Sequence, residues 1–132
     1  MVIVRPITRT IISTVSFGFP VVDWINNMTP TPWVAPTYLN GWTGNAKYRR
    51  IGDILYLGGN LAGGAIGQQM FLLPTGFIPQ TGFEIAVVTR NAAGNVPGHV
   101  AINLAGAVTL WSGATAPITG VMFTGVNVPL AF

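Results

Sequence analysis

From Tyr38 onward, Gly, Pro and Asn interrupt the chain every 8–12 residues, and the runs between them are short and rich in β-branched and aromatic residues. This spacing is typical of an all-β sandwich or barrel, because each run is long enough for a strand and too short for a helix. We therefore predict an antiparallel, jelly-roll-like β-sandwich with no long helix. The predicted strands cover residues 38–43, 46–51, 53–61, 68–73, 83–89, 98–104, 106–111 and 119–128.

The side-chain alternation in these runs predicts which strands are covered on one face and which on both. In 98–104, Val100, Ile102 and Leu104 face one way and polar or small residues face the other, and Ala105-Gly106 then reverses the chain into a hairpin. The runs 53–61 and 121–128 are apolar on both faces. Since no amphipathic helix is left to cover a second face, we expect a neighbouring copy of the chain to do so, which predicts a homo-oligomer.

Three parts follow one another along the sequence. Residues 1–27 combine a strand-like alternation with one apolar helical turn, and they are too short to bury themselves. Residues 28–37 contain three prolines and predict an extended linker, and residues 38–132 form the predicted knob. The first part either packs on the knob or docks as an arm on another subunit, and its separation by the linker favours the arm. The expected anchors are Ile11, Val15, Phe17, Trp24 and Ile25.

The scarcity of charge excludes several classes of function. Charged residues make up 7% of the chain, against about 25% in an average soluble domain, so a free monomer would be poorly protected against association. The net charge of +3 comes from six basic and three acidic residues, without the basic stripe that nucleic-acid binding requires. The most apolar windows, 54–66 and 100–110, are broken well before the roughly 20 residues of a membrane span. The N-terminus has neither the apolar run nor the cleavage pattern of a signal peptide.

Few residues could perform chemistry. His99 is the only histidine, and none of Ser13, Ser16 or Ser112 lies in a nucleophile-elbow pattern. The chain has no Cys and no calcium-loop motif, and the Gly-rich run 58–67 lacks the Lys-Ser or Lys-Thr of a phosphate loop. We therefore expect no catalytic residue, no metal and no cofactor. A glycoside hydrolase that uses Asp53 and Glu84 is the one enzymatic alternative, and it needs both carboxylates to meet in the fold.

One local concentration of basic residues is Lys47-Tyr48-Arg49-Arg50, with Trp42 nearby. In a strand, Lys47 and Arg49 face one way and Tyr48 and Arg50 the other, so the charge is divided between two faces. We interpret the cluster as solvated or interface charge. The alternative is a ligand contact in which Tyr48 and Trp42 stack on a nucleic-acid base or a sugar. Trp42, Tyr48 and Trp111 are the residues expected to stack on sugar rings if the protein binds glycans.

Five segments resemble parts of known protein families. Residues 38–43 (YLNGWT), 48–64 (YRRIGDILYLGGNLAGG) and 71–79 (FLLPTGFIP) resemble the small β-sandwich domains of virion proteins from tailed bacteriophages. The front pieces 7–14 (ITRTIIST) and 18–25 (GFPVVDWI) are similar to attachment segments of minor virion proteins of actinobacterial phages. The resemblance is strongest from about Trp33 to Pro79, and beyond that it is limited to the rhythm of the strands.

The resemblance implies a trimeric knob on a virion, used as a capsid decoration or head-fibre protein or as a tail-fibre tip. A fibre tip usually ends a much longer chain, whereas an arm, a linker and one knob suit a decoration protein. We expect a non-enzymatic minor capsid protein whose arm binds the major capsid protein or another virion protein. The alternative is a tail-fibre or baseplate tip that binds glycans of the host surface.

Overall fold

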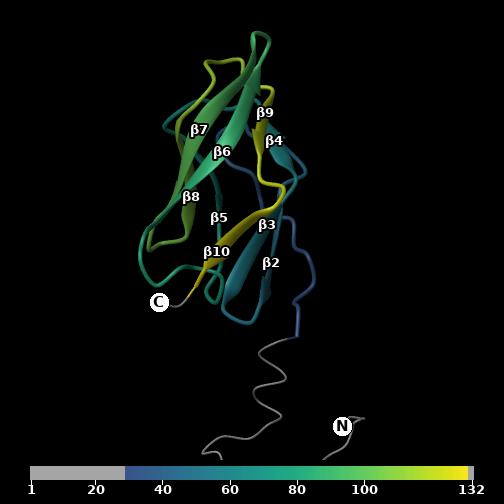
Figure 1. Ribbon diagram of the computed structural model, residues 1–132, viewed down its shortest axis with the longest axis vertical. Helices are drawn as coiled ribbons and strands as arrows, with labels where there is room; N and C mark the ends of the chain where they lie inside the picture. Colours follow the sequence, from purple (N-terminus) through teal and green to yellow (C-terminus); the bar gives the residue numbers. More distant parts are fainter. Residues whose placement is uncertain (1–28, 131–132) are drawn as a thin grey trace, which may run out of the picture.

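The computed structural model describes residues 29–130, which form an all-β knob with ten strands and no helix (Figure 1). The strands are β1 (Thr43–Gly44), β2 (Lys47–Ile51), β3 (Ile54–Gly58), β4 (Asn60–Ala62), β5 (Gln69–Leu72), β6 (Phe83–Asn91), β7 (Gly94–Ile102), β8 (Ala107–Ser112), β9 (Gly120–Met122) and β10 (Val126–Pro129). The predicted fold class is confirmed. The expected anchors Ile11, Val15, Phe17, Trp24 and Ile25 lie outside the described residues.

The strands form two antiparallel sheets. The large sheet has the order β1-β4-β9-β6-β7-β8-β5 and curls into half of a barrel, and the small sheet has the order β10-β3-β2. In Figure 1 the long β6–β7 hairpin runs along the front of the knob, and the small sheet lies beside its lower half. Every strand pair is antiparallel, and short turns join the β2–β3, β6–β7 and β7–β8 pairs.

Two segments cross from one sheet to the other, and both were predicted as single strands. The run 53–61 divides at Gly59 into β3 and β4, and the run 119–128 divides at residues 124–125 into β9 and β10. Gly59 has φ +76°, and a Cβ there would collide with the backbone carbonyl of Asn45. Only glycine combines this backbone conformation with so close a neighbour, so Gly59 permits the kink.

The core lies between the sheets. Leu55, Leu57 and Val128 of the small sheet face Val100, Ile102, Leu110 and Val121 of the large sheet, and all are buried. Phe71 and Phe123 meet edge to face at the centre, with ring centroids 5.9 Å apart. The predicted inward face of 98–104 is correct for Val100 and Ile102 but wrong for Leu104. That residue lies in the turn after β7, and 67% of it is exposed.

Two other strand boundaries differ from the prediction. Residues 38–42 are a loop, because Asn40 and Gly41 both have positive φ and only residue 43 enters a strand. The strand predicted to begin at residue 98 begins at Gly94, so residues 95–98 are not a turn and the chain reverses at residues 92–93. Pro97 is tolerated because β7 is an edge strand at this position. Pro97 pairs with Val88 of β6 on one side, and β8 joins the other side of β7 only from His99 onward.

The predicted linker is docked on the small sheet over part of its length. The Val34 amide donates to the Tyr48 carbonyl, and the Tyr48 amide donates to the Val34 carbonyl, both at 2.9 Å. The Thr31 amide also donates to the Arg50 carbonyl at 2.9 Å. Residues 31–34 therefore protect the outer edge of β2, although the three prolines prevent a regular ladder.

Candidate binding surfaces

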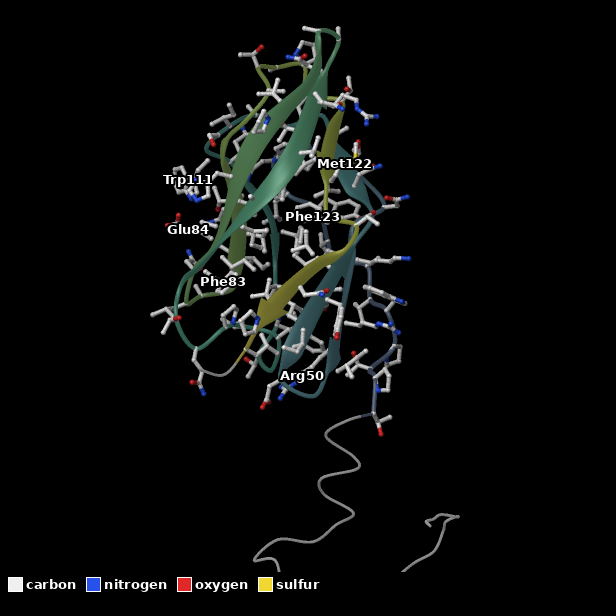
Figure 2. All side chains as sticks on the ribbon, in the orientation of Figure 1. Arg50, Phe83, Glu84, Trp111, Met122 and Phe123 are labelled. Carbon is white, nitrogen blue, oxygen red and sulfur yellow. The ribbon has the colours of Figure 1, made fainter. Side chains whose placement is uncertain are left out.

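The outer face of the large sheet is exposed and largely apolar. Val88 of β6 lies directly opposite Pro97 of β7 on one side and Met122 of β9 on the other. Val88 is 45% exposed, although it occupies the middle of a sheet. Figure 2 shows Met122 to the right of the β6–β7 hairpin and Trp111 to its left, on β9 and β8. Within the described residues this face has no covering layer, which is unusual for apolar side chains in a central strand.

Trp111 and an ion pair lie together on the same face. Trp111 is 55% exposed and occupies a β-bulge, where the register of β7 with β8 shifts between His99 and Val100. His99 Nε2 lies 2.8 Å from Glu84 Oε1 across the β6–β7 pair, and Figure 2 shows Trp111 and Glu84 on the same side of the knob. The group offers one aromatic plane, one carboxylate and one imidazole on an open surface.

This group does not form a hydrolytic triad. Ser112 lies opposite His99 in the register, but their side chains form no hydrogen bond with each other in the described structure. The site lies on an open sheet face, without the enclosed donors that would stabilise an oxyanion.

Asp53 and Glu84 do not form a carboxylate pair. Asp53 lies in the β2–β3 turn of the small sheet, 3.3 Å from a guanidinium nitrogen of Arg50, whereas Glu84 pairs with His99 on the large sheet. Each carboxylate has its own partner, Arg50 for Asp53 and His99 for Glu84. No cluster of three or more metal-binding side chains exists in residues 29–130, and no helix there could cross a membrane.

Two of the predicted sugar contacts are wrong, because both side chains are buried. Trp42 is 2% exposed and packs against Gly64, where a Cβ would overlap the indole ring. Tyr48 is 6% exposed, and its ring centroid lies 5.0 Å from that of Phe77. Burial raises the pKa of Tyr48 above its ordinary value of 10.0. Trp111 is the member of this set that stays accessible.

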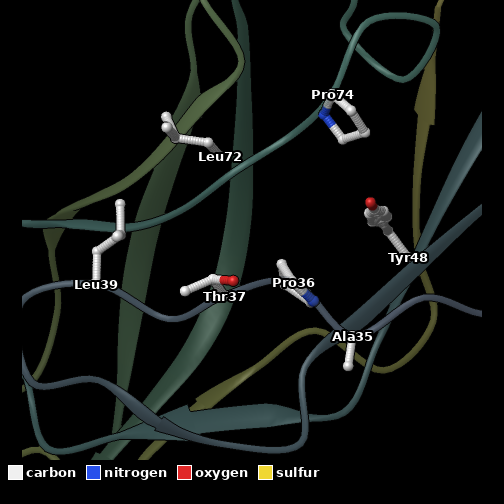
Figure 3. Close-up of a pocket in the computed structure, with 7 residues that line it drawn as sticks. All are labelled: Ala35, Pro36, Thr37, Leu39, Tyr48, Leu72 and Pro74. Carbon is white, nitrogen blue, oxygen red and sulfur yellow. The ribbon is translucent and has the colours of Figure 1, made fainter.

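A shallow cavity of about 360 Å³ opens between the proline-rich segment and the end of β5. Its lining consists of Ala35, Pro36, Thr37, Leu39, Tyr48, Leu72 and Pro74 (Figure 3). The lining is apolar apart from two hydroxyl groups and carries no charge. Such a cavity can hold an apolar side chain, but it offers no group for catalysis.

The basic cluster is divided as the alternation predicts, and the structure adds an unpredicted partner. Arg50 bonds to the Gly52 and Gly76 carbonyls and pairs with Asp53. Lys47 and Arg49 lie on the opposite face, over the ring of Trp33. Trp33 was not predicted because it lies in the expected linker, and no local pattern indicates that this segment docks on β2.

Comparison of the chain with protein-family models, curated proteins and solved structures gave no match.

Proposed function

We propose that this chain is a non-enzymatic structural protein of a virion, a capsid decoration protein whose knob assembles as a homotrimer and whose residues 1–27 attach it to the capsid. The virion location rests on the resemblance of residues 33–79 to phage β-sandwich domains. The self-association is supported by the exposed apolar face of the large sheet, and this is the observation that carries the proposal.

The chemistry of this face suits contact with a like surface. Val88, Pro97 and Met122 form an apolar row across three strands, and Glu84 and Arg90 are the charged residues of β6 on the same face. Burying such a row against a second copy removes apolar area from water at about 25 cal/mol per Å². A surface with little charge also meets little repulsion from its own copies. The two carboxylates of residues 29–130 lie on different sheets, and no cluster of three metal-binding side chains is present there, which fits a structural role better than a catalytic one.

Sedimentation of the full chain and of two variants tests the self-association. Val88→Glu places a charge in the apolar row, and we expect it to convert a trimer at about 10 μM into monomer, because burying a carboxylate in an interface is costly even with Arg90 two residues along the same face. Leu104→Glu is the matched control. It introduces the same charge at an exposed leucine in the β7–β8 turn, and we expect it to leave the trimer intact. A monomeric parent chain, or equal dissociation by both variants, would contradict the proposal.

The attachment is tested on particles. We expect a chain that lacks residues 1–27 to keep a folded knob and to lose binding to the virion, and labelled full-length protein should decorate the capsid in electron micrographs. Label found only at the tail tip would contradict the decoration role and would support a receptor-binding role at the tail.

The second candidate is a tail-fibre or baseplate tip that binds glycans, and the Trp111 site favours it specifically. An exposed indole beside a carboxylate and an imidazole can stack on a sugar ring and bond to its hydroxyl groups. On a glycan array, Trp111→Ala should abolish any signal from this site, while Leu72→Ala, an exposed apolar residue of another strand, should not. A signal that survives Trp111→Ala would exclude the indole as the contact.

A further inference from the structure

The outer face of the small sheet carries two cations that no carboxylate neutralises within residues 29–130. Lys47 and Arg49 lie two residues apart on β2, opposite Gly58 and Tyr56 of β3, so all four share the face that points away from the core. The described acids are engaged elsewhere, Asp53 by Arg50 and Glu84 by His99. This face therefore has a local positive potential in a chain with little charge.

Trp33 holds both cations in place. The Lys47 Nζ atom lies 4.9 Å and the Arg49 guanidinium carbon 4.5 Å from the centre of the Trp33 ring. A Cβ at Gly58 would lie 3.2 Å from Lys47 Cε and 3.6 Å from the edge of the Trp33 ring, so the glycine leaves room for both side chains. Because Val34 is hydrogen-bonded to β2, the indole is anchored next to the cations. Cation–π contacts of this kind reduce the freedom of two long side chains before any ligand arrives.

Arg49 also has hydrogen-bonding capacity that the fold does not use. Its Nε atom is buried and makes no hydrogen bond within the described residues. Since no protein acceptor engages the Arg49 guanidinium within the described residues, an oxyanion that binds it displaces no existing hydrogen bond.

We propose that this face, formed by Trp33, Lys47, Arg49 and Tyr56, binds an acidic polysaccharide. Along a strand, residues two apart are separated by about 6.6 Å, so the cations can reach carboxylates on one sugar chain. Tyr56 shares the face and is half-buried, so its ring can contact the apolar side of a sugar. An open, two-cation surface suits a flexible acidic chain, whereas duplex nucleic acid needs a larger basic footprint. The proposal involves residues separate from Trp111 and does not depend on the virion role.

Biolayer interferometry of the full chain on immobilised hyaluronate, with neutral dextran as the reference, tests this site. We expect binding to hyaluronate at about 50 mM salt, strong weakening at about 300 mM salt, and none to dextran. Lys47→Gln and Arg49→Gln should each weaken binding about fivefold, and together more than about tenfold. Arg90→Gln is the charge-matched control on the large sheet, and its affinity should stay within about twofold of the parent chain.

Several results would overturn the proposal. Absence of hyaluronate binding at low salt, or equal losses from Arg49→Gln and Arg90→Gln, would remove the site. Duplex DNA bound as tightly as hyaluronate would mean a general attraction for polyanions and no recognition of sugar. Trp33→Leu tests whether the indole positions the two cations. The variant keeps both charges, and we expect it to weaken binding because the cations lose their contact with the ring. Its circular dichroism and thermal midpoint should show that the knob is folded, and unchanged affinity in a folded Trp33→Leu chain would refute the role of the indole.

Discussion

Thr89 provides the clearest test of how the large sheet is held together. The residue is fully buried near the end of β6, and it is one of two buried residues of the described structure that are classed as polar, with Thr109. Its hydroxyl donates to the Val96 carbonyl at 2.7 Å and accepts a hydrogen bond from the Ala114 amide at 2.7 Å. Gly113 packs so closely that a Cβ there would lie 2.7 Å from the hydroxyl. Thr89 therefore links the loop after β8 to the β6–β7 hairpin through hydrogen bonds.

Thr89→Val keeps the size of the side chain and removes both hydrogen bonds. Loss of an ordinary bond costs about 1 kcal/mol, and the Ala114 amide left without a partner costs roughly 1–3 kcal/mol more. The added methyl group returns about 0.8 kcal/mol of that loss. We expect a net destabilisation of about 2 kcal/mol, which lowers the midpoint of thermal unfolding by about 8 °C in a domain of this size.

Urea unfolding followed by tryptophan fluorescence measures this loss, at one fixed protein concentration because self-association would add to the apparent stability. Thr89→Ser is the control, since it keeps both bonds, loses only a methyl group and should cost about 1 kcal/mol. Hydrogen exchange at the Ala114 amide gives a local readout, and its protection should fall in Thr89→Val alone. A Thr89→Val chain as stable as the parent chain, or one in which the Ala114 amide keeps its protection from exchange, would refute this role of the Thr89 hydroxyl.

Three further predictions concern the core, the sheet crossing and alkaline pH. Phe123→Ala should lower the free energy of unfolding by about 3–5 kcal/mol in urea, because Phe123 is fully buried against Phe71, and a loss below about 1 kcal/mol would argue against a tight core. Gly59→Ala should lower the thermal midpoint far more than Gly67→Ala. Both glycines have positive φ, but an added Cβ would collide with backbone atoms only at Gly59. Equal shifts of the midpoint would contradict this prediction. Burial raises the pKa of Tyr48 in the folded chain, so the unfolded chain loses its proton first and stability should fall as the pH rises above about 10. Tyr48→Phe should reduce that fall in thermal scans at alkaline pH, and an unchanged slope would show that Tyr48 is not responsible.

The sequence determined the fold class and much of the strand pattern. Gly, Pro and Asn recur at the spacing of short strands, and the alternation through Val100 and Ile102 predicted the buried face of β7. The same local logic predicted the division of Lys47 and Arg49 from Arg50. These features depend on neighbours within a few residues, so the sequence contains the necessary information.

Only the tertiary structure decided where the sheets cross and which aromatic residues are accessible. Trp42, Tyr48 and Trp111 are equivalent in a one-dimensional pattern, yet the first two fill the core and the third lies on a bulge. Trp33 joins Lys47 and Arg49 because a segment predicted to be a linker adds to the edge of β2. Exposure and contact of this kind depend on strand register and on pairing between distant residues. Period-two alternation specifies the two faces of a strand but not what covers them.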